Sequence, residues 1–219
     1  MTEKHIAFDR VAEFMTAVLG RAGVPATDAH TITDVLIRAD KLGFDSHGVN
    51  RLKPIYLDRI REGILNPLTR WEVLRETPAT AVIDGHNGMG HVVAFNAMQL
   101  AIKKAGDTGM GMVAVRNSSH YGFAGYYPLM ATEKNMIGIT GTNARPSIAP
   151  TFGVEGMLGT NPLTFGMPTD EDFPFLLDCA TSITQRGKVE LYACEGKAMT
   201  PGWVIDEKGG SKTNAVEVL

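Results

Sequence analysis

Ser46, His47 and Arg51 are the residues whose types and spacing best suit proton and carboxylate chemistry. His47 and Arg51 are four positions apart, so on a helix they would share one face. An imidazole exchanges a proton near neutral pH, and a guanidinium holds a carboxylate through two parallel hydrogen bonds. Together these groups meet the needs of oxidising a 2-hydroxy acid, with Ser46 able to orient the imidazole. The alternative, which the spacing alone favours, is a helix cap followed by a solvated arginine.

A second histidine, His120, lies where a strand is expected to give way to a helix. The apolar run 110–115 predicts a buried strand, residues 117–120 a polar turn, and residues 121–134 a helix whose apolar face includes Ala124, Leu129 and Ala131. Ligands of open α/β sheets collect at the carboxyl ends of strands, and Gly122 would let one approach the backbone. The alternative is a capped loop with an incidental histidine.

Three further side chains are weaker candidates. Arg145 lies in the Gly- and Pro-rich stretch 143–168, expected to be a long loop, where it could form a second carboxylate clamp or only a surface ion pair. Lys188 could contact a ligand or be solvated. Cys179 follows a predicted buried strand and is expected to be a small apolar filler.

The familiar cofactor motifs are absent from the sequence. No GxGxxG follows a predicted strand, and there is no P-loop, HExxH or GxSxG. A conventional Rossmann dinucleotide site is therefore unsupported.

The elements that must position these side chains follow from apolar spacing. Before residue 65 the pattern predicts three helices: 8–20, a second capped by Thr27 or Asp28 and stopped by Gly43, and a third over 52–60 that Pro54 kinks or begins. After Asn66 the pattern changes. Strands are expected at 71–74, 80–83, 136–140 and 173–177, and helices at 92–105 and 183–193.

Composition excludes several functional classes. The 219 residues are 44% hydrophobic and 21% charged, enough for one large or two small domains. A net charge of −3 gives no electrostatic case for nucleic acid or anionic membrane. No apolar run is long enough to span a bilayer, and the N-terminus lacks a signal core. Cys179 and Cys194 have no metal-like spacing, so a reduced, cytoplasmic protein without a metal site is expected.

Six stretches taken together resemble the type-2 malate/L-lactate dehydrogenase family, and they occur in the family's order. They are SHGVNRLKPIY (46–56), IDGHNGMG (83–90), VRNSSHYGFAGYY (115–127), TNARPSIAP (142–150), MLGTNPLTFGMP (157–168) and LDCATSITQRGK (177–188). The resemblance implies an α/β (α+β) fold. A helical domain (1–70) would stand beside an α/β domain (71–219) that binds NAD(P) in a non-Rossmann, sulfolactate-dehydrogenase-like manner, in a homodimer.

The resemblance also implies roles for individual residues. Ser46 and His47 match the proton-transfer pair, with His120 as the rival base, and Arg51 matches the carboxylate anchor. Thr160 and Arg145 fall at substrate-side positions. Cofactor contacts are implied for His120, Tyr121, Gly122, Phe123, Ala124, Asp178, Cys179 and Ala180.

The sequence departs from the family pattern in two ways. Some members have an acidic residue at the position of Lys188, completing a relay to the serine and histidine. Family chains also continue well beyond residue 219, so a C-terminally truncated cofactor domain is expected here. The expected activity is NAD(P)-dependent oxidation of malate or lactate, with NAD the first choice. The alternatives are a reductase of a cyclic imino acid or keto sugar acid, and an inactive fragment that only dimerises or binds ligand.

Overall fold

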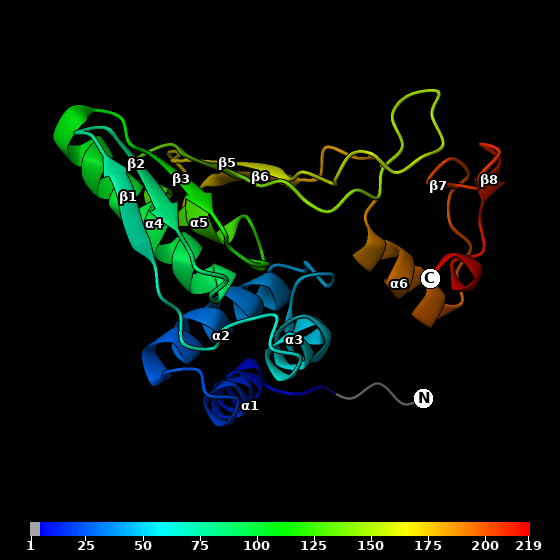
Figure 1. Ribbon diagram of the computed structural model, residues 1–219, viewed down its shortest axis with the longest axis horizontal. Coiled ribbons are helices and arrows are strands. Elements are labelled where there is room, and N and C mark those ends of the chain that lie inside the picture. Colours follow the sequence, from blue (N-terminus) through cyan, green and yellow to red (C-terminus); the bar gives the residue numbers. More distant parts are fainter. Residues whose placement is uncertain (1–4) are drawn as a thin grey trace.

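A computed structural model describes residues 5–219 of the chain as a mixed α/β structure, as expected. Figure 1 shows the N-terminal helices on one side of the molecule and the two three-stranded sheets on the other. A small unit built on helix α6 lies at one end of the view.

The first two helices pack through the apolar stripes that their sequences predict. Helix α1 (Phe8–Arg21) buries Met15 and Leu19 against α2 (Ala26–Lys41), whereas Phe14 remains 60% exposed. The expected cap of α2 by Thr27 or Asp28 is wrong. The helix begins at Ala26, directly after Pro25, whose carbonyl accepts the Ala29 N–H at 2.8 Å. Gly43, with φ +77°, follows the helix end as predicted.

The third predicted helix is divided into three short segments. A 3₁₀ turn, η1 (Val49–Arg51), leads into a π-helical turn, η2 (Leu52–Leu57), and then into α3 (Asp58–Arg61). Pro54 lies inside the π-helical turn. His47 belongs to the turn before η1, so the expectation that His47 and Arg51 share one helical face is wrong.

The first sheet contains β1 (Glu72–Glu76), β2 (Thr80–Asp84) and β3 (Met112–Arg116). Strand β2 pairs antiparallel with β1 and parallel with β3. Helix α4 (Gly90–Thr108) makes the crossover and packs against the sheet through Ile83, Val93 and Ala97. The run at 110–115 is not the buried strand expected. Met110 is 69% and Met112 62% exposed, because β3 is the last strand of the sheet and α4 packs against one face only.

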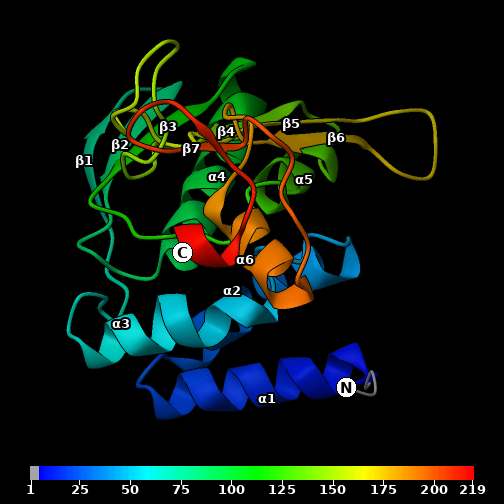
Figure 2. The same ribbon diagram turned by 90° about the vertical axis from the view of Figure 1, so that its right-hand side faces the viewer.

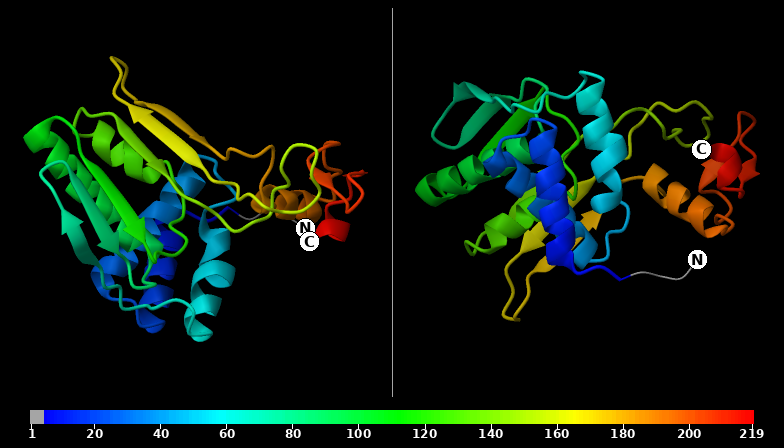
Figure 3. Two further views of the ribbon diagram at one scale, coloured as in Figure 1. Left: turned by 45° about the horizontal axis from the view of Figure 1, so that its top comes forward. Right: turned by 90° about the horizontal axis from the view of Figure 1, so that it is seen from below.

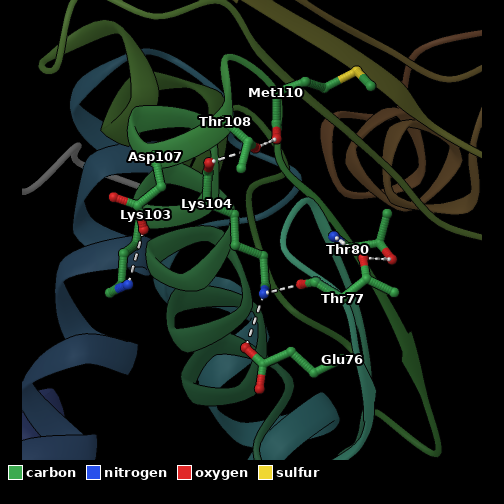
Figure 4. A network of polar contacts seen from close by, with 8 residues as sticks. All are labelled: Glu76, Thr77, Thr80, Lys103, Lys104, Asp107, Thr108 and Met110. Carbon is green, nitrogen blue, oxygen red and sulfur yellow. Dashed lines mark hydrogen bonds and ion pairs between the residues drawn. The ribbon is translucent and has the colours of Figure 1, made fainter.

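A buried lysine ties α4 to the turn between β1 and β2, as Figure 4 shows. Lys104 Nζ donates to Glu76 Oε1 at 2.8 Å and to the Thr77 carbonyl at 2.7 Å. Its side chain is only 6% exposed, so both contacts are needed to balance the cost of burying the ammonium. The link fixes the far end of α4, whose other end approaches His120.

The second sheet is antiparallel and consists of β4 (Gly138–Gly141), β5 (Leu163–Met167) and β6 (Phe175–Cys179). Helix α5 (Tyr126–Thr132) covers one face, where Gly138 and Gly166 leave room for Pro128. The other face carries the register row Ile139, Phe165 and Leu177, of which Ile139 is 55% exposed. Two expectations fail here: the stretch 143–168 contains β5 instead of being loop throughout, and the helix expected from residue 121 begins only at Tyr126.

The C-terminal residues have a small core of their own. Helix α6 (Arg186–Glu195), β7 (Val204–Ile205), β8 (Ser211–Lys212) and the 3₁₀ turn η3 (Val216–Val218) surround Val189, Met199 and Ala215. Figure 3 shows this unit beside the α1–α3 helices, joined to the sheets by extended segments. The division into domains at residues 70/71 stays a prediction. No helix within residues 5–219 is both long and apolar enough to cross a membrane.

Candidate active site

The loop that carries Ser46 and His47 is held against helix α2 by Asp40. Asp40 Oδ2 accepts the N–H of Val49 at 2.9 Å, at the start of the η1 turn. Gly48 lies so close to this carboxylate that a Cβ at position 48 would be 1.6 Å from Asp40 Oδ1. With glycine at position 48 the carboxylate can approach the backbone this closely, which anchors the loop just after the histidine.

His47 is oriented by a chain of two hydrogen bonds. Ser46 Oγ lies 2.8 Å from His47 Nδ1, and Gln185 Nε2 donates to the same oxygen at 2.9 Å. Because Gln185 provides the donor, the Ser46 hydroxyl hydrogen is free to point to Nδ1. Ser46 Oγ also keeps a lone pair, so it can face Nδ1 either as a donor or as an acceptor.

His120 has a ring orientation fixed by two donors. Tyr56 Oη is 2.7 Å from His120 Nδ1, and the Gly122 N–H donates to the same nitrogen at 3.3 Å. The rings of His47 and His120 stack with centroids 5.7 Å apart and an interplanar angle of 10°. The structure therefore brings the two rival histidines into one site.

Burial keeps these imidazoles neutral. It lowers the pKa of His47 to about 4, helped by the charge of Arg51. Burial also lowers the pKa of His120 to about 3, with smaller contributions from His47, Arg59 and Arg51. Burial raises the pKa of the Tyr56 phenol well above its usual range, so its hydroxyl remains a donor.

Behind this pair lies His91, which is fully buried. Its ring meets the Tyr56 ring edge-on at 4.6 Å, and neither ring nitrogen has a partner within residues 5–219. A Cβ at position 122 would come within 2.8 Å of His91 Nε2, and Gly122 has φ +77°. The turn after His120 therefore strongly favours glycine at position 122.

Arg51 points at the same loop and is held by helix α6. Its Nε donates to the Ser46 carbonyl at 2.6 Å, and Nη1 pairs with Glu190 Oε2 at 2.8 Å. The other carboxylate oxygen of Glu190 accepts from Arg186 Nε at 2.9 Å. Gly187 allows the helix to sit this close, since a Cβ there would be 2.5 Å from Arg51 Nη2. In Figure 2, α6 is drawn in front of α2.

The two segments expected to contact a cofactor are adjacent. The Gly125 N–H donates to Asp178 Oδ2 at 2.7 Å, which joins the turn after His120 to the end of β6. Thr164 donates to the other carboxylate oxygen at 3.1 Å. Burial raises the pKa of Asp178, although both hydrogen bonds act in the opposite direction. Within the turn, Phe123 and Ala124 are buried, whereas Tyr121 is half-buried and stacks on Tyr127 with centroids 5.1 Å apart.

Within residues 5–219, no hydrogen bond or ion pair joins the remaining sequence candidates to His47 or His120. Thr160 is linked to the β6 end because its carbonyl accepts the Thr181 N–H at 2.9 Å, next to half-buried Ala180. Arg145 is exposed and makes no hydrogen bond or ion pair within the described chain. Cys179 is exposed and not an apolar filler, because β6 ends on the open face of its sheet. Lys188 Nζ lies over the Trp203 ring, 4.8 Å from its centre.

Four residues of the site were not singled out from the sequence, although Tyr56 and Gln185 lie within two of the family-like stretches: Tyr56, His91, Gln185 and Glu190. Each acts across a long sequence separation, which is 139 residues for both the Ser46–Gln185 and the Arg51–Glu190 contacts. Within residues 5–219, no group of three His, Cys, Asp or Glu side chains could hold a metal ion.

This arrangement of fold and site matches one family. A model of the malate/L-lactate dehydrogenase family matches residues 6–219, so the chain belongs to this family, as the resemblance predicted.

Two curated relatives illustrate the match. The chain is 51% identical over 211 residues to a malate dehydrogenase of Pyrococcus horikoshii, covering 96% of this chain and 58% of the relative. It is 44% identical over 203 residues to an L-sulfolactate dehydrogenase of Methanocaldococcus jannaschii, covering 92% and 58%. The chain thus spans well under two thirds of the length of these relatives.

A solved structure has nearly the same fold over the shared region. The crystal structure of malate dehydrogenase from Entamoeba histolytica matches with a TM-score of 0.97 at 46% identity. The match covers 99% of this chain and 60% of that chain.

Proposed function

We propose that the protein transfers a hydride between a nicotinamide cofactor and a small 2-hydroxy acid, with malate or lactate as the preferred substrate. The observation that carries this proposal is the hydrogen-bonded Ser46–His47 pair stacked beside His120, with Arg51 bound to the same loop. The malate and sulfolactate dehydrogenases among its relatives support a hydroxy acid over a cyclic imine or a keto sugar acid. They also favour an active enzyme over an inert fragment.

Hydrogen-bond direction separates the two rival bases. His120 Nδ1 faces the Gly122 N–H, which can only donate, so a second proton on that ring would point at another hydrogen. The Ser46 hydroxyl facing His47 can either donate or accept. His47 can therefore alternate between the neutral and the charged form without losing its partner. This supports His47 as the proton-transfer residue and His120 as a fixed N–H donor.

In this mechanism the bound cofactor supplies or accepts the hydride at the substrate carbon. The charged His47 gives its Nε2 proton to the substrate oxygen and keeps the Nδ1 proton, which Ser46 Oγ accepts; in the reverse direction the neutral ring takes up the hydroxyl proton at Nε2. Nε2–H of His120 adds a donor to the charge that develops on the oxygen. Arg51 keeps N–H groups beyond those used by Ser46 and Glu190, and these anchor the carboxylate.

The residues around Asp178 fit a nicotinamide cofactor. Thr184 follows the end of β6, and its Oγ1 is buried with no hydrogen-bond partner within residues 5–219. A carboxamide or ribose hydroxyl would provide one. Burial raises the pKa of Tyr121 to about 12, so the phenol stays protonated as a potential donor. Tyr121, Asp178 and Thr184 would thus line the cofactor side, with NAD the first choice over NADP.

The proposed cofactor region is of a non-Rossmann type. Its support is the missing glycine fingerprint together with the antiparallel β1–β2, β4–β5 and β5–β6 pairings, which a doubly wound parallel sheet lacks. We also propose a homodimer, as the family resemblance implies. Equilibrium sedimentation of the purified protein tests the dimer, and a monomer at all concentrations would refute it.

The decisive experiment follows nicotinamide absorbance during turnover. The purified protein is mixed with NADH or NADPH and, in turn, oxaloacetate, pyruvate, sulfopyruvate and a cyclic imino acid. We expect absorbance loss with a 2-oxo acid and none after His47→Ala, while cofactor binding followed by fluorescence is retained. His30→Ala, at an exposed position on α2, is the matched control. Activity surviving His47→Ala but lost in His120→Ala would reverse the two assignments.

A further inference from the structure

We propose that Phe44 and Phe123 form a positioning pair that fixes the spacing between the rings of His47 and His120. The inference rests on the proposed roles of the two histidines and extends them to two aromatic rings that carry no group able to exchange a proton. The observation behind it is the contact between these rings, whose centroids lie 4.5 Å apart with an interplanar angle of 38°.

Each phenylalanine belongs to the same short segment as one of the histidines. Phe44 precedes His47 by three residues, and the His47 N–H donates to the Phe44 carbonyl at 2.9 Å. Phe123 follows His120 by three residues, and the Gly122 N–H between them donates to His120 Nδ1 at 3.3 Å. A shift of either phenylalanine backbone therefore moves the histidine of the same segment.

Helix α2 is the common base of the two phenylalanines. Phe123, which the family resemblance places among the cofactor contacts, is 1% exposed, and its ring packs against the fully buried Val35 and Ala39 of α2. The Phe44 N–H donates to the Ala39 carbonyl at 2.9 Å, just beyond the last turn of this packed face. The Phe44–Phe123 contact is therefore built on a rigid element, and it is formed outside the proton-transfer chemistry.

Two ring contacts connect the segments 44–47 and 120–123. One is the phenylalanine pair, and the other is the stack of the histidine rings, with centroids 5.7 Å apart and an interplanar angle of 10°. A single contact would let the segments pivot about it, whereas two contacts fix both their distance and their tilt. A displacement of about 1 Å at a reacting group can cost about 100-fold in rate. The apolar pair therefore keeps the histidine pair in register.

The direct test is the nuclear Overhauser effect between the ring protons of His47 and His120 in the full chain, labelled with ¹³C-histidine. The chain has six histidines, and His47→Ala and His120→Ala identify the two sets of signals. We expect a cross-peak between the stacked rings of the wild type. Phe44→Leu and Phe123→Leu should weaken this cross-peak and shift both sets of signals. Phe44 is only half-buried, so Phe44→Leu tests the pair even where Phe123→Leu unfolds.

The matched control is Leu100→Ala. Leu100 is also partly buried, but it packs in the separate cluster between α4 and the first sheet. The substitution should lower the free energy of unfolding and leave the histidine cross-peak and kcat unchanged. A loss of kcat in the phenylalanine variants is then an effect of position and not of general stability.

Kinetics give a second readout that a merely structural residue would not move. In Phe44→Leu, kcat should fall about tenfold, while the KM for the acid and the Kd of the cofactor stay within about twofold. The acid affinity is retained because Arg51 is held separately by Glu190 at 2.8 Å. The double variant Phe44→Leu/Phe123→Leu should lose no more kcat than the worse single variant, because the two rings act as one unit.

The possible outcomes are distinct. A wild-type protein without the histidine cross-peak, or an unchanged cross-peak in the folded phenylalanine variants, overturns the inference. Independent, multiplying losses of kcat in the double variant also overturn it, and so does a raised KM with an unchanged kcat. A chain that shows the cross-peak and its loss in Phe44→Leu, but no turnover with any substrate, contradicts the proposed function and leaves the positioning pair standing.

Discussion

The hydroxyl of Tyr56 donates a 2.7 Å hydrogen bond to Nδ1 of His120, at the nitrogen that the Gly122 N–H also reaches. This contact joins the π-helical turn of the helical region to the turn after β3. Because both groups donate to Nδ1, His120 carries its proton on Nε2 and can only donate there. His47 is then the imidazole whose partner, the Ser46 hydroxyl, can either donate or accept.

Tyr56→Phe should therefore weaken the hydrogen bonding of His120 without leaving a cavity in the site. The ring volume is retained, but Nδ1 keeps only the longer bond from Gly122. We expect a fall of about 1–2 kcal/mol in the free energy of unfolding and a drop in kcat. Denaturant titration and steady-state kinetics measure both. Tyr192→Phe is the control, since its hydroxyl makes no hydrogen bond within residues 5–219; equal losses in both variants would contradict the argument.

Arg51→Lys should mainly raise the KM for the acid. A lysine cannot contact the Ser46 carbonyl, Glu190 and a substrate carboxylate at once, because the planar fork is lost. We expect at least a tenfold rise in KM with a smaller change in kcat, read from initial rates. An unchanged KM would exclude Arg51 as the carboxylate anchor.

Glu190→Gln should have the opposite effect on KM. The amide oxygen can still accept from Arg51 Nη1, but the negative charge 2.8 Å from the guanidinium is removed. An anionic substrate should then bind more tightly, with the larger gain for a dicarboxylate. Glu195→Gln on the same helix, where the carboxylate pairs with Lys197 at 2.8 Å, should leave KM unchanged. A weaker substrate affinity in Glu190→Gln would show that the charge is needed to hold Arg51.

The free energy of unfolding should fall as the pH drops below the usual pKa of a histidine side chain. The folded-state pKa of His47 is lowered to about 4 and that of His120 to about 3, whereas both titrate near 6.5 when unfolded. Between these values the unfolded chain binds protons that the folded chain does not. The free energy of unfolding is therefore complete above about pH 6.5 and decreases toward about pH 4, by up to about 1.4 kcal/mol per pH unit for each histidine.

Urea unfolding across this range measures the slope, and His91 provides the comparison. Burial lowers the pKa of His91 well below its usual value, and its ring nitrogens have no partner within residues 5–219. His91→Leu should flatten the slope, whereas His30→Gln at an exposed position should not. Parallel slopes in wild type and His91→Leu would refute this contribution.

Gly122→Ala should destabilise the fold far more than an ordinary glycine replacement. The position combines φ +77° with a Cβ only 2.8 Å from His91 Nε2. We expect a loss of about 3–4 kcal/mol, the left-handed backbone cost plus overpacking. Gly196→Ala has a similar φ of +64° and open space, so it should lose about 1–2 kcal/mol in the same denaturant assay. Equal losses would mean that the contact with His91 relaxes freely.

The fold could be predicted where local patterns determine it. The apolar stripe of α2 buries Ile32, Val35, Leu36 and Ala39 as expected, because a 3.6-residue period leaves one face for the core. The open face of β3 and strand β5 could not be predicted. An apolar run does not show whether both of its faces are covered, and the glycine and proline residues around Leu163 mimic a loop.

The candidate site was predictable only in part for a related reason. Motifs indicated Ser46, His47, Arg51 and His120, and the structure brings these four together through contacts of the loop, Tyr56 and α6. Their orienting partners, Gln185 and Glu190, sit on an ordinary-looking helix start. Only the tertiary fold shows that this helix lies on the serine loop. For Arg145 the contacts of the described chain add nothing to the sequence motif.

The 139-residue separation between Ser46 and Gln185 also bears on the order of folding. During synthesis, the serine loop leaves the ribosome with α1 and α2, long before α6 exists. Closing so large a loop costs entropy that one hydrogen bond cannot offset, so the contact must wait until the sheets have brought the two ends together. We expect a refolding chain to bury its helical core first and to gain a correctly poised His47 last. A newly synthesised molecule is then inactive until this long-range contact has formed.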